Sequence, residues 1–153
     1  ALNRGRGMIL VANKWDLAGK KGDLKALRDQ VERRLPHLSW AELLTMSAMT
    51  GKGVNKLLPT LDQVSENHRR RIETAELNRW LRHCIEEQPP PLHHHHLVRM
   101  YYATQVLVRP PKIVVFTNSP EGIPEHYGRY LINRLRERYE LEGTPVLLQY
   151  RQR

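Results

Sequence analysis

The sequence predicts an α/β protein in two parts: an incomplete, doubly wound parallel sheet over residues 1–72 and a small α+β domain over residues 73–153. Three observations predict it. Residues 8–12 are a continuous apolar run, which is typical of a strand buried on both faces. Strand and helix patterns alternate as far as residue 64. After the prolines at 89–91, two strand patterns follow each other without a helix between them.

In the first part, residues 8–12 and 43–47 are predicted strands, and residues 24–35 and 54–64 are predicted helices. Because a helix separates the two strands, they are expected to pair in parallel. The predicted buried faces of the helices comprise Leu24, Leu27, Val31, Leu35, Val54, Leu57, Leu58, Leu61 and Val64. Two strands and two helices cannot cover both faces of a sheet, so we expect residues 1–72 to be the last third of a larger domain.

The second part is expected to begin near residues 70–74 with an amphipathic helix that ends before Pro89. Residues 97–108 and 113–117 predict an antiparallel strand pair. A helix from Pro124 to Tyr139 and a strand over 146–150 complete an α–β–β–α–β order, with the helices on one face of the sheet.

Charge points to an anionic partner. The chain has 25 Lys and Arg against 16 Asp and Glu, a net charge of +9, and residues 1–72 carry 14 of the basic and 7 of the acidic side chains. Nucleic acid is the first candidate, and a basic protein whose charges only solvate it is the alternative. No apolar run approaches the roughly 18 residues of a membrane-spanning helix, so no membrane partner is expected.

Cys84 is the only cysteine, which excludes an internal disulfide and a cysteine-rich zinc site and fits a reducing compartment. It lies on the apolar face of its predicted helix. We therefore expect a buried core thiol, and a reactive thiol is the alternative.

The segment Asn13-Lys14-Trp15-Asp16 directly follows the first strand, at the edge of an open α/β sheet where ligands bind. A carboxylate at Asp16 can accept hydrogen bonds from two fixed N–H donors, which guanine offers on N1 and N2 and adenine does not. The Lys14 stem can cover a purine face, and the Asn13 amide can tie neighbouring loops together. A polar exit from the strand, with Asn and Asp serving a turn, is the alternative.

A second candidate segment, residues 47–54, follows the second strand. The backbone N–H of Ala48 can reach a guanine carbonyl oxygen, since a small side chain at Ala48, next to Ser47, lets the backbone approach. A glycine turn with Ser or Thr capping a helix is the alternative. Both segments lie at carboxyl ends of predicted parallel strands, which favours a joint site.

These residues resemble the GTPase superfamily: Asn13-Lys14-Trp15-Asp16 is similar to its NKxD base-recognition motif, and Ser47-Ala48 to its SA motif. The second part resembles the C-terminal KH-like domain of the EngA family, also called Der. The segments that carry this likeness are Gln88-Pro89-Pro90-Pro91, Tyr102-Ala103-Thr104-Gln105, Pro110-Pro111, Arg129-Tyr130-Leu131-Ile132-Asn133 and Gly143-Thr144-Pro145. The resemblance covers nearly the whole chain.

The resemblance implies a partial P-loop GTPase (G) domain over residues 1–72 and a KH-like domain over 73–153, seen as a C-terminal fragment. The family has two consecutive GTPase domains and acts in assembly of the large ribosomal subunit. It implies GTP or GDP as ligand, guanine-binding roles for Asn13, Lys14, Asp16, Ser47 and Ala48, and Mg²⁺ bound by residues outside the fragment. Expected partners are the large ribosomal subunit and ribosomal RNA, with no DNA. The expected location is the cytoplasm, with a mitochondrion or plastid as the alternative.

The sequence departs from a complete GTPase in two respects: these residues contain no G-x-x-x-x-G-K-[ST] phosphate loop and no candidate switch segment. No catalytic residue is therefore expected in this chain, which should be inactive alone while the parent protein hydrolyses GTP. The KH-like part also lacks the GxxG loop with which ordinary KH domains hold nucleotide backbones.

Several basic side chains are candidate RNA contacts, and they are Lys20, Lys21, Arg69, Arg70, Arg71, Arg134 and Arg138. For the arginines of the last helix, a solvated face with local ion pairs is the alternative. Tyr101 and Tyr102 are expected on opposite strand faces, one in the core and one free to stack on a base.

For His93-His94-His95-His96 three interpretations stay open: an exposed polar loop, a phosphate-facing patch, or a metal site. The metal site is the least expected of the three, and no metal ligand is assigned, because consecutive histidines on an extended segment alternate faces and four of them cannot converge on one ion.

Two hypotheses for function remain. The chain belongs to a ribosome-assembly GTPase, or it is an RNA- or protein-binding module without nucleotide chemistry.

Overall fold

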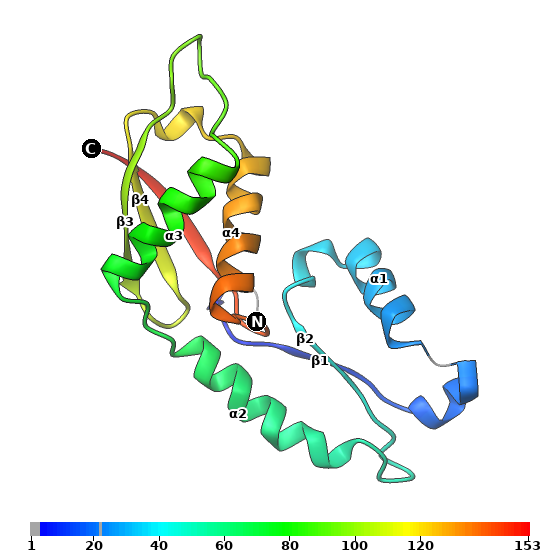
Figure 1. Cartoon of the computed structure of the whole chain (residues 1–153). Helices are drawn as coiled ribbons and strands as arrows, with labels where there is room; N and C mark the ends of the chain where they lie inside the picture. The colour runs from blue at the N-terminus through cyan, green and yellow to red at the C-terminus, as the bar shows by residue number, and fades with distance from the viewer. Residues whose placement is uncertain (1–3, 22) are drawn as a thin grey trace. The chain divides into compact units, whose positions relative to one another are not determined.

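The computed structural model describes residues 4–21 and 23–153, without the side chains of residues 19–21. Two compact units divide the chain: Ala1–His68 together with Glu142–Pro145, and Arg69–Leu141 together with Val146–Arg153. Each unit has its own sheet (Figure 1).

The first unit is built on a parallel strand pair, β1 (Ile9–Ala12) and β2 (Glu42–Thr45), in which Leu10 lies opposite Leu43. Between the strands come the 3₁₀ helix η2 (Trp15–Lys21), the helix α1 (Leu24–Arg34) and the 3₁₀ helix η3 (Pro36–Leu38). After β2 follow η4 (Val54–Lys56) and α2 (Leu57–His68). The predicted order of strand, helix, strand and helix and the parallel pairing are confirmed.

The prediction that these elements are buried is wrong. No residue of α1 is buried, and Leu24 and Leu58 are 46% and 71% exposed. Val64, at 7% exposed, is the one member of the two predicted apolar faces that is buried, and Val11 in the middle of β1 is 40% exposed. The reason is geometric. Two short strands offer too little apolar surface to bury the apolar faces of two helices, and two helices cannot cover both faces of the strand pair.

A segment distant in sequence completes the first unit. The N–H of Gly143 donates to the carbonyl oxygen of Trp40 at 2.8 Å, and the N–H of Met8 donates to the carbonyl oxygen of Gly143 at 2.7 Å. Gly143 has a φ of +72°, and a Cβ there would lie 2.4 Å from Cγ2 of Val64. Only glycine fits this position, because both the left-handed backbone and the close approach exclude a side chain.

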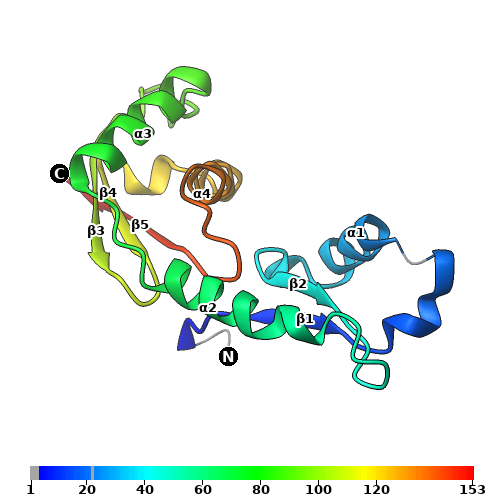
Figure 2. The ribbon, with the colours of Figure 1, turned by 60° about the horizontal axis from the view of Figure 1, so that its bottom comes forward.

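The second unit contains a three-stranded sheet in the order β3 (Met100–Leu107), β4 (Lys112–Thr117), β5 (Leu147–Gln152). β3 and β4 are antiparallel, whereas β4 and β5 are parallel. The 3₁₀ helix η5 (Pro120–Gly122) follows β4. The helices α3 (Thr74–Glu87) and α4 (Glu125–Tyr139) lie on the same face of the sheet (Figure 2). The predicted α–β–β–α–β order, with helices on one face, is confirmed.

The core of this unit lies between the two helices and the sheet. Leu77, Leu131, Ile113 and Val115 are fully buried there, and Cys84 is 1% exposed. The strong amphipathic pattern of α3 supplies much of that core. Within the described residues, every helix is too short or too polar to cross a membrane.

Candidate functional site

The carboxyl ends of β1 and β2 bring the two sequence motifs of the first unit together. The carboxamide oxygen Oδ1 of Asn13 accepts hydrogen bonds from the N–H of Lys14 at 2.8 Å and from the N–H of Ala48 at 3.1 Å. Neighbouring parallel strands end at the same edge of a sheet, so loops 35 residues apart in sequence meet there. Asn13 ties these two loops together.

The backbone around Asn13 is held on both sides. The N–H of Met46 donates to the carbonyl oxygen of Ala12 at 3.0 Å, and the N–H of Trp15 donates to the carbonyl oxygen of Met46 at 3.1 Å. Between them, Lys14 has a φ of +57°, a conformation that non-glycine residues rarely adopt. The exposed Lys14 side chain therefore leaves the strand at a sharp turn.

Asp16 lies in the first turn of η2 and has a hydrogen-bonding capacity that the fold does not use. Its Oδ1 atom is buried and has no hydrogen-bond partner among the described residues. A buried carboxylate oxygen without a donor is destabilising, so such atoms are rare in folded proteins. Because this atom is shielded from solvent, an N–H donor of a ligand can reach it only after the loops around it move.

Ser47 and Ala48 have different surroundings. Ser47 is 1% exposed; its hydroxyl accepts from the N–H of Thr50 at 3.2 Å, and its own N–H donates to the carbonyl oxygen of Lys52 at 2.8 Å. Ser47 therefore closes a turn. Ala48 is exposed, but its N–H, which we expected to face a guanine carbonyl, donates to Asn13 in this structure.

The candidate RNA contacts that precede α3 in the chain differ in accessibility. Arg69 and Arg71 are exposed, whereas Arg70 is half-buried and its carbonyl oxygen accepts from the Gln105 side chain at 3.0 Å. The side chains of Lys20 and Lys21 lie outside the described residues. Arg69 and Arg71 thus remain candidates on accessibility.

The two candidates on α4 also differ. The guanidinium of Arg134 forms ion pairs with Glu87 of α3 and, at 3.0 Å, with Glu137. The hydrogen bond to Glu87, followed in size of effect by the one to Glu137, raises the pKa of Arg134 above its usual range. Local ion pairs, the alternative interpretation of this face, are therefore present at Arg134. Arg138 is exposed.

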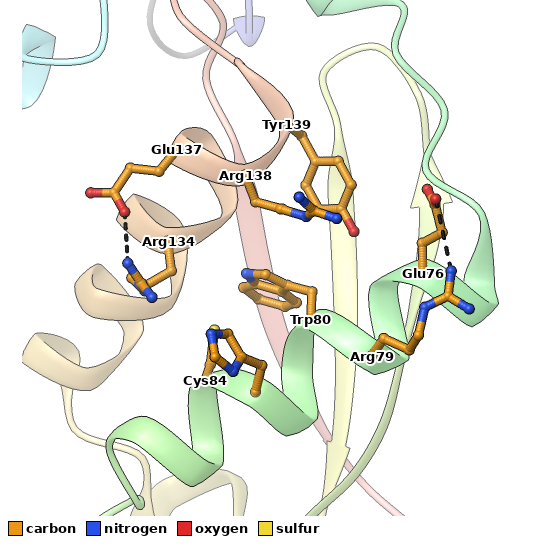
Figure 3. Close-up of a pocket in the computed structure, with 9 residues that line it drawn as sticks. Glu76, Arg79, Trp80, Cys84, Arg134, Glu137, Arg138 and Tyr139 are labelled. Atoms are coloured by element: carbon orange, nitrogen blue, oxygen red, sulfur yellow. Dashed lines mark hydrogen bonds and ion pairs between the residues drawn. The ribbon is translucent and has the colours of Figure 1, made fainter.

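A pocket of about 480 Å³ lies between α3 and α4 in the second unit, on different elements from the two motifs (Figure 3). Trp80 lies in the middle of the side chains that line it. Its Nε1 atom is buried without a hydrogen-bond partner among the described residues. The other lining residues are Glu76, Arg79, His83, Cys84, Arg134, Glu137, Arg138 and Tyr139.

Cys84 is the core thiol that its helical position predicts. Burial raises the pKa of the Cys84 thiol to about 11, and the nearby charge of Arg134 opposes the shift only partly. A raised pKa keeps the thiol protonated near neutral pH, and only the thiolate reacts as a nucleophile. A buried, inert thiol is therefore favoured over a reactive one.

We expect iodoacetamide at pH 8 to alkylate Cys84 in the folded chain at least about a hundredfold more slowly than in the urea-unfolded chain, where the thiol has a pKa of about 8.5. The lower thiolate fraction gives this factor, and burial adds to it. Mass spectrometry of quenched samples measures both rates. Equal rates in the two states would contradict the assignment of Cys84 as a core thiol.

The four consecutive histidines form a tight turn, and the expectation of an extended segment is wrong. The backbones of His93 and His96 exchange two hydrogen bonds of 2.9 Å, and the central residues His94 and His95 have φ values of +49° and +64°. Positive φ at both central residues is typical of two-residue hairpin turns. Nδ1 of His93 lies 3.1 Å from the hydroxyl oxygen of Ser119. Within the described residues, no three metal-ligating side chains are grouped so as to hold an ion.

Tyr101 and Tyr102 are both exposed, by 42% and 39%, so the expectation that one lies in the core is wrong. The register of β3 on β4 shifts between Met100 and Tyr102, which makes Tyr101 the extra residue of a bulge. A bulge interrupts the alternation on which the prediction rested.

Comparison with known proteins agrees with the resemblance to the EngA family. The family model described as the KH-domain-like, C-terminal domain of EngA bacterial GTPase enzymes matches residues 71–151. GTPase Der of Citrifermentans bemidjiense is 42% identical over 154 residues, which cover all of this chain and 35% of that protein. GTPase Der of Dinoroseobacter shibae is 43% identical and covers 99% of this chain and 31% of that protein.

A solved structure of Era, in complex with MgGDPNP and nucleotides 1506–1542 of 16S ribosomal RNA, aligns with 94% of this chain and 54% of that chain. The sequence identity is 18% and the TM-score is 0.30, a value that does not establish a common overall fold.

The second unit is thus a KH-like α+β domain joined to part of an α/β sheet. The chain belongs to the EngA family of bacterial GTPases, to which the proteins named GTPase Der also belong. It spans about a third of the length of the curated relatives that it matches.

Proposed function

We propose that this chain is the C-terminal part of a GTP-binding ribosome-biogenesis factor of the cytoplasm. In this proposal residues 1–72 supply the guanine-recognition end of a G domain, and residues 73–153 are a KH-like domain that contacts ribosomal RNA of the large subunit. GTP hydrolysis belongs to the whole protein, with Mg²⁺ bound by residues outside this chain.

The observation that carries the proposal is the double hydrogen bond accepted by Asn13, from Lys14 and from Ala48. It supports a joint site because it links an NKxD-like and an SA-like segment at one sheet edge. The carboxylate of Asp16 is the proposed acceptor for the N1 and N2 donors of guanine, and its buried, unpartnered Oδ1 becomes available to a base when the loops around it move. In this arrangement Asp16 reads the base, the Lys14 stem covers a purine face, and Asn13, Ser47 and Ala48 hold the loops around it.

Exposed apolar side chains in the first unit give independent support for a larger G domain. Val11 of β1 and Leu24 of α1 are 40% and 46% exposed. Apolar strands of parallel sheets are normally covered on both faces. Further strands and helices of the same domain would cover this surface.

The experiment compares the full-length protein with the 153-residue chain. We expect the full-length protein to bind and hydrolyse GTP and to co-sediment with large ribosomal subunits, because it would carry the phosphate loop that these residues lack. We expect the 153-residue chain to show no hydrolysis. Contacts to phosphates also predict that raising salt from 50 to 200 mM weakens ribosomal RNA binding by more than tenfold.

Two outcomes would contradict parts of this proposal. A full-length protein that binds ribosomal RNA but no guanine nucleotide would leave a binding module without nucleotide chemistry. An affinity for ribosomal RNA that does not change with salt would exclude the phosphate contacts assigned to Arg69, Arg71 and Arg138, and to Lys20 and Lys21.

A further inference from the structure

The sheet of the second unit has one face that α3 and α4 do not cover (Figures 1 and 2). Ala103, Ile113 and Val115 are fully buried in the core, on the helix side. Because side chains alternate along a strand, Tyr102, Val114 and Phe116 point to the opposite face. We call this surface the open sheet face; its residues are Tyr102, Thr104, Lys112, Val114, Phe116, Leu147, Gln149 and Arg151, of which Val114 is fully buried.

An aromatic pair lies at the centre of one row of this face. The rings of Tyr102 and Phe116 are stacked, with centroids 4.4 Å apart and an interplanar angle of 15°. Phe116 is partly exposed and Tyr102 is 39% exposed, so the pair offers ring surface to solvent. At the same end of the sheet, the guanidinium of Arg153 lies 4.9 Å from the ring centroid of Tyr101.

The charged side chains of the three strands are all basic. No Asp or Glu occurs in β3, β4 or β5, whereas Lys112 and Arg151 are basic. Arg151 is exposed and lies directly opposite Phe116 in the parallel register, so a positive charge borders the aromatic pair. In the next row Val114 is fully buried, and Oε1 of Gln149 opposite it is buried without a hydrogen-bond partner among the described residues, so the aromatic row is the part of this face that is open to a ligand.

We propose that the open sheet face binds single-stranded RNA, with a base stacked on Tyr102 and phosphates bound by Arg151 and Lys112. This inference rests on the RNA-binding role proposed above and assigns that role to a surface. Exposed rings bordered by cations suit unpaired nucleotides, because every base has a face that can stack and every nucleotide carries a phosphate. The surface replaces the GxxG loop that the domain lacks.

The test measures binding of a fluorescein-labelled, unstructured 12-nucleotide RNA to the 153-residue chain by fluorescence anisotropy. We expect Tyr102→Leu to weaken binding about tenfold, since stacking on an aromatic ring is lost, and Tyr102→Phe to bind as the unchanged chain does. We expect Arg151→Ala to lower the slope of log affinity against log salt by about 0.7. Arg82→Ala removes an equal charge from an exposed position on α3 and should change neither quantity.

Competitors identify the kind of partner. Unlabelled single-stranded RNA should displace the probe, whereas a 12-base-pair RNA duplex and a poly-glutamate peptide should not. The inference is overturned if the peptide or the duplex competes equally well, if Tyr102→Leu binds normally, or if the chain does not bind the RNA. Binding that survives Tyr102→Leu and Arg151→Ala in variants with unchanged circular dichroism would leave an RNA-binding domain with its site elsewhere.

Discussion

Asp16→Asn in the full-length protein is expected to lower the affinity for GDP about a hundredfold and to raise the affinity for xanthosine diphosphate. The carboxylate of Asp16 can accept from two N–H groups of guanine, and each hydrogen bond to a charged group contributes about 1.5–3 kcal/mol. The amide of asparagine places an N–H donor where an acceptor is needed. Xanthine carries a carbonyl oxygen in place of the guanine amino group, so it suits that donor.

Isothermal titration of both diphosphates into both proteins measures this exchange of preference. Asp62→Asn is the matched control, because Asp62 is an exposed carboxylate on α2 and the substitution removes the same charge. An unchanged ratio of the two affinities in Asp16→Asn would show that Asp16 does not read the base, and the proposed guanine site would fail with it.

Asn78→Ala is expected to destabilise the KH-like domain by about 2 kcal/mol. The Asn78 side chain on α3 exchanges two hydrogen bonds with the backbone of Ala103 on β3, accepting at 2.9 Å and donating at 3.0 Å, and also donates to the carbonyl oxygen of Thr74 at 2.7 Å. Ala103 is fully buried, and among the described residues no strand pairs with the outer side of β3. Alanine at position 78 leaves an N–H and a carbonyl group of the edge strand unpaired.

Urea unfolding of the chain measures the loss of stability, and hydrogen exchange at the amide of Ala103 locates it. The control is Asn133→Ala, an exposed position on α4, because both substitutions change helix propensity alike. Equal stability of the two variants, with unchanged exchange at Ala103, would show that Asn78 does not secure the edge of β3.

Local patterns in the sequence predict most of the elements for physical reasons that are visible in single segments. The apolar run before Asn13 indicates a strand, and the spacing of Leu77, Leu81 and Cys84 indicates the buried face of a helix. The order of strands and helices then places both motifs at one sheet edge, where Asn13 and Ala48 are hydrogen-bonded.

Other features depend on contacts that no local pattern encodes. The apolar stripes that include Leu24 on α1 and Leu58 on α2 have helical periodicity. Their burial, however, requires a partner surface that two strands do not supply. Tyr101 and Tyr102 would alternate on a regular strand, and a one-residue shift against β4 exposes both. His94 and His95 turn the chain although no glycine or asparagine marks a turn.

The order of the strands and helices and the meeting of Asn13 with Ala48 at one sheet edge therefore follow from residue types and their periodicity along the chain. Tertiary contacts decide that Gly143 packs against Val64 in the first unit, that Asn78 pairs the edge of β3, and that Tyr102 stacks on Phe116. Periodicity reports which side of an element is apolar, whereas long-range hydrogen bonds and strand register depend on residues tens of positions apart, and only the folded chain brings those together.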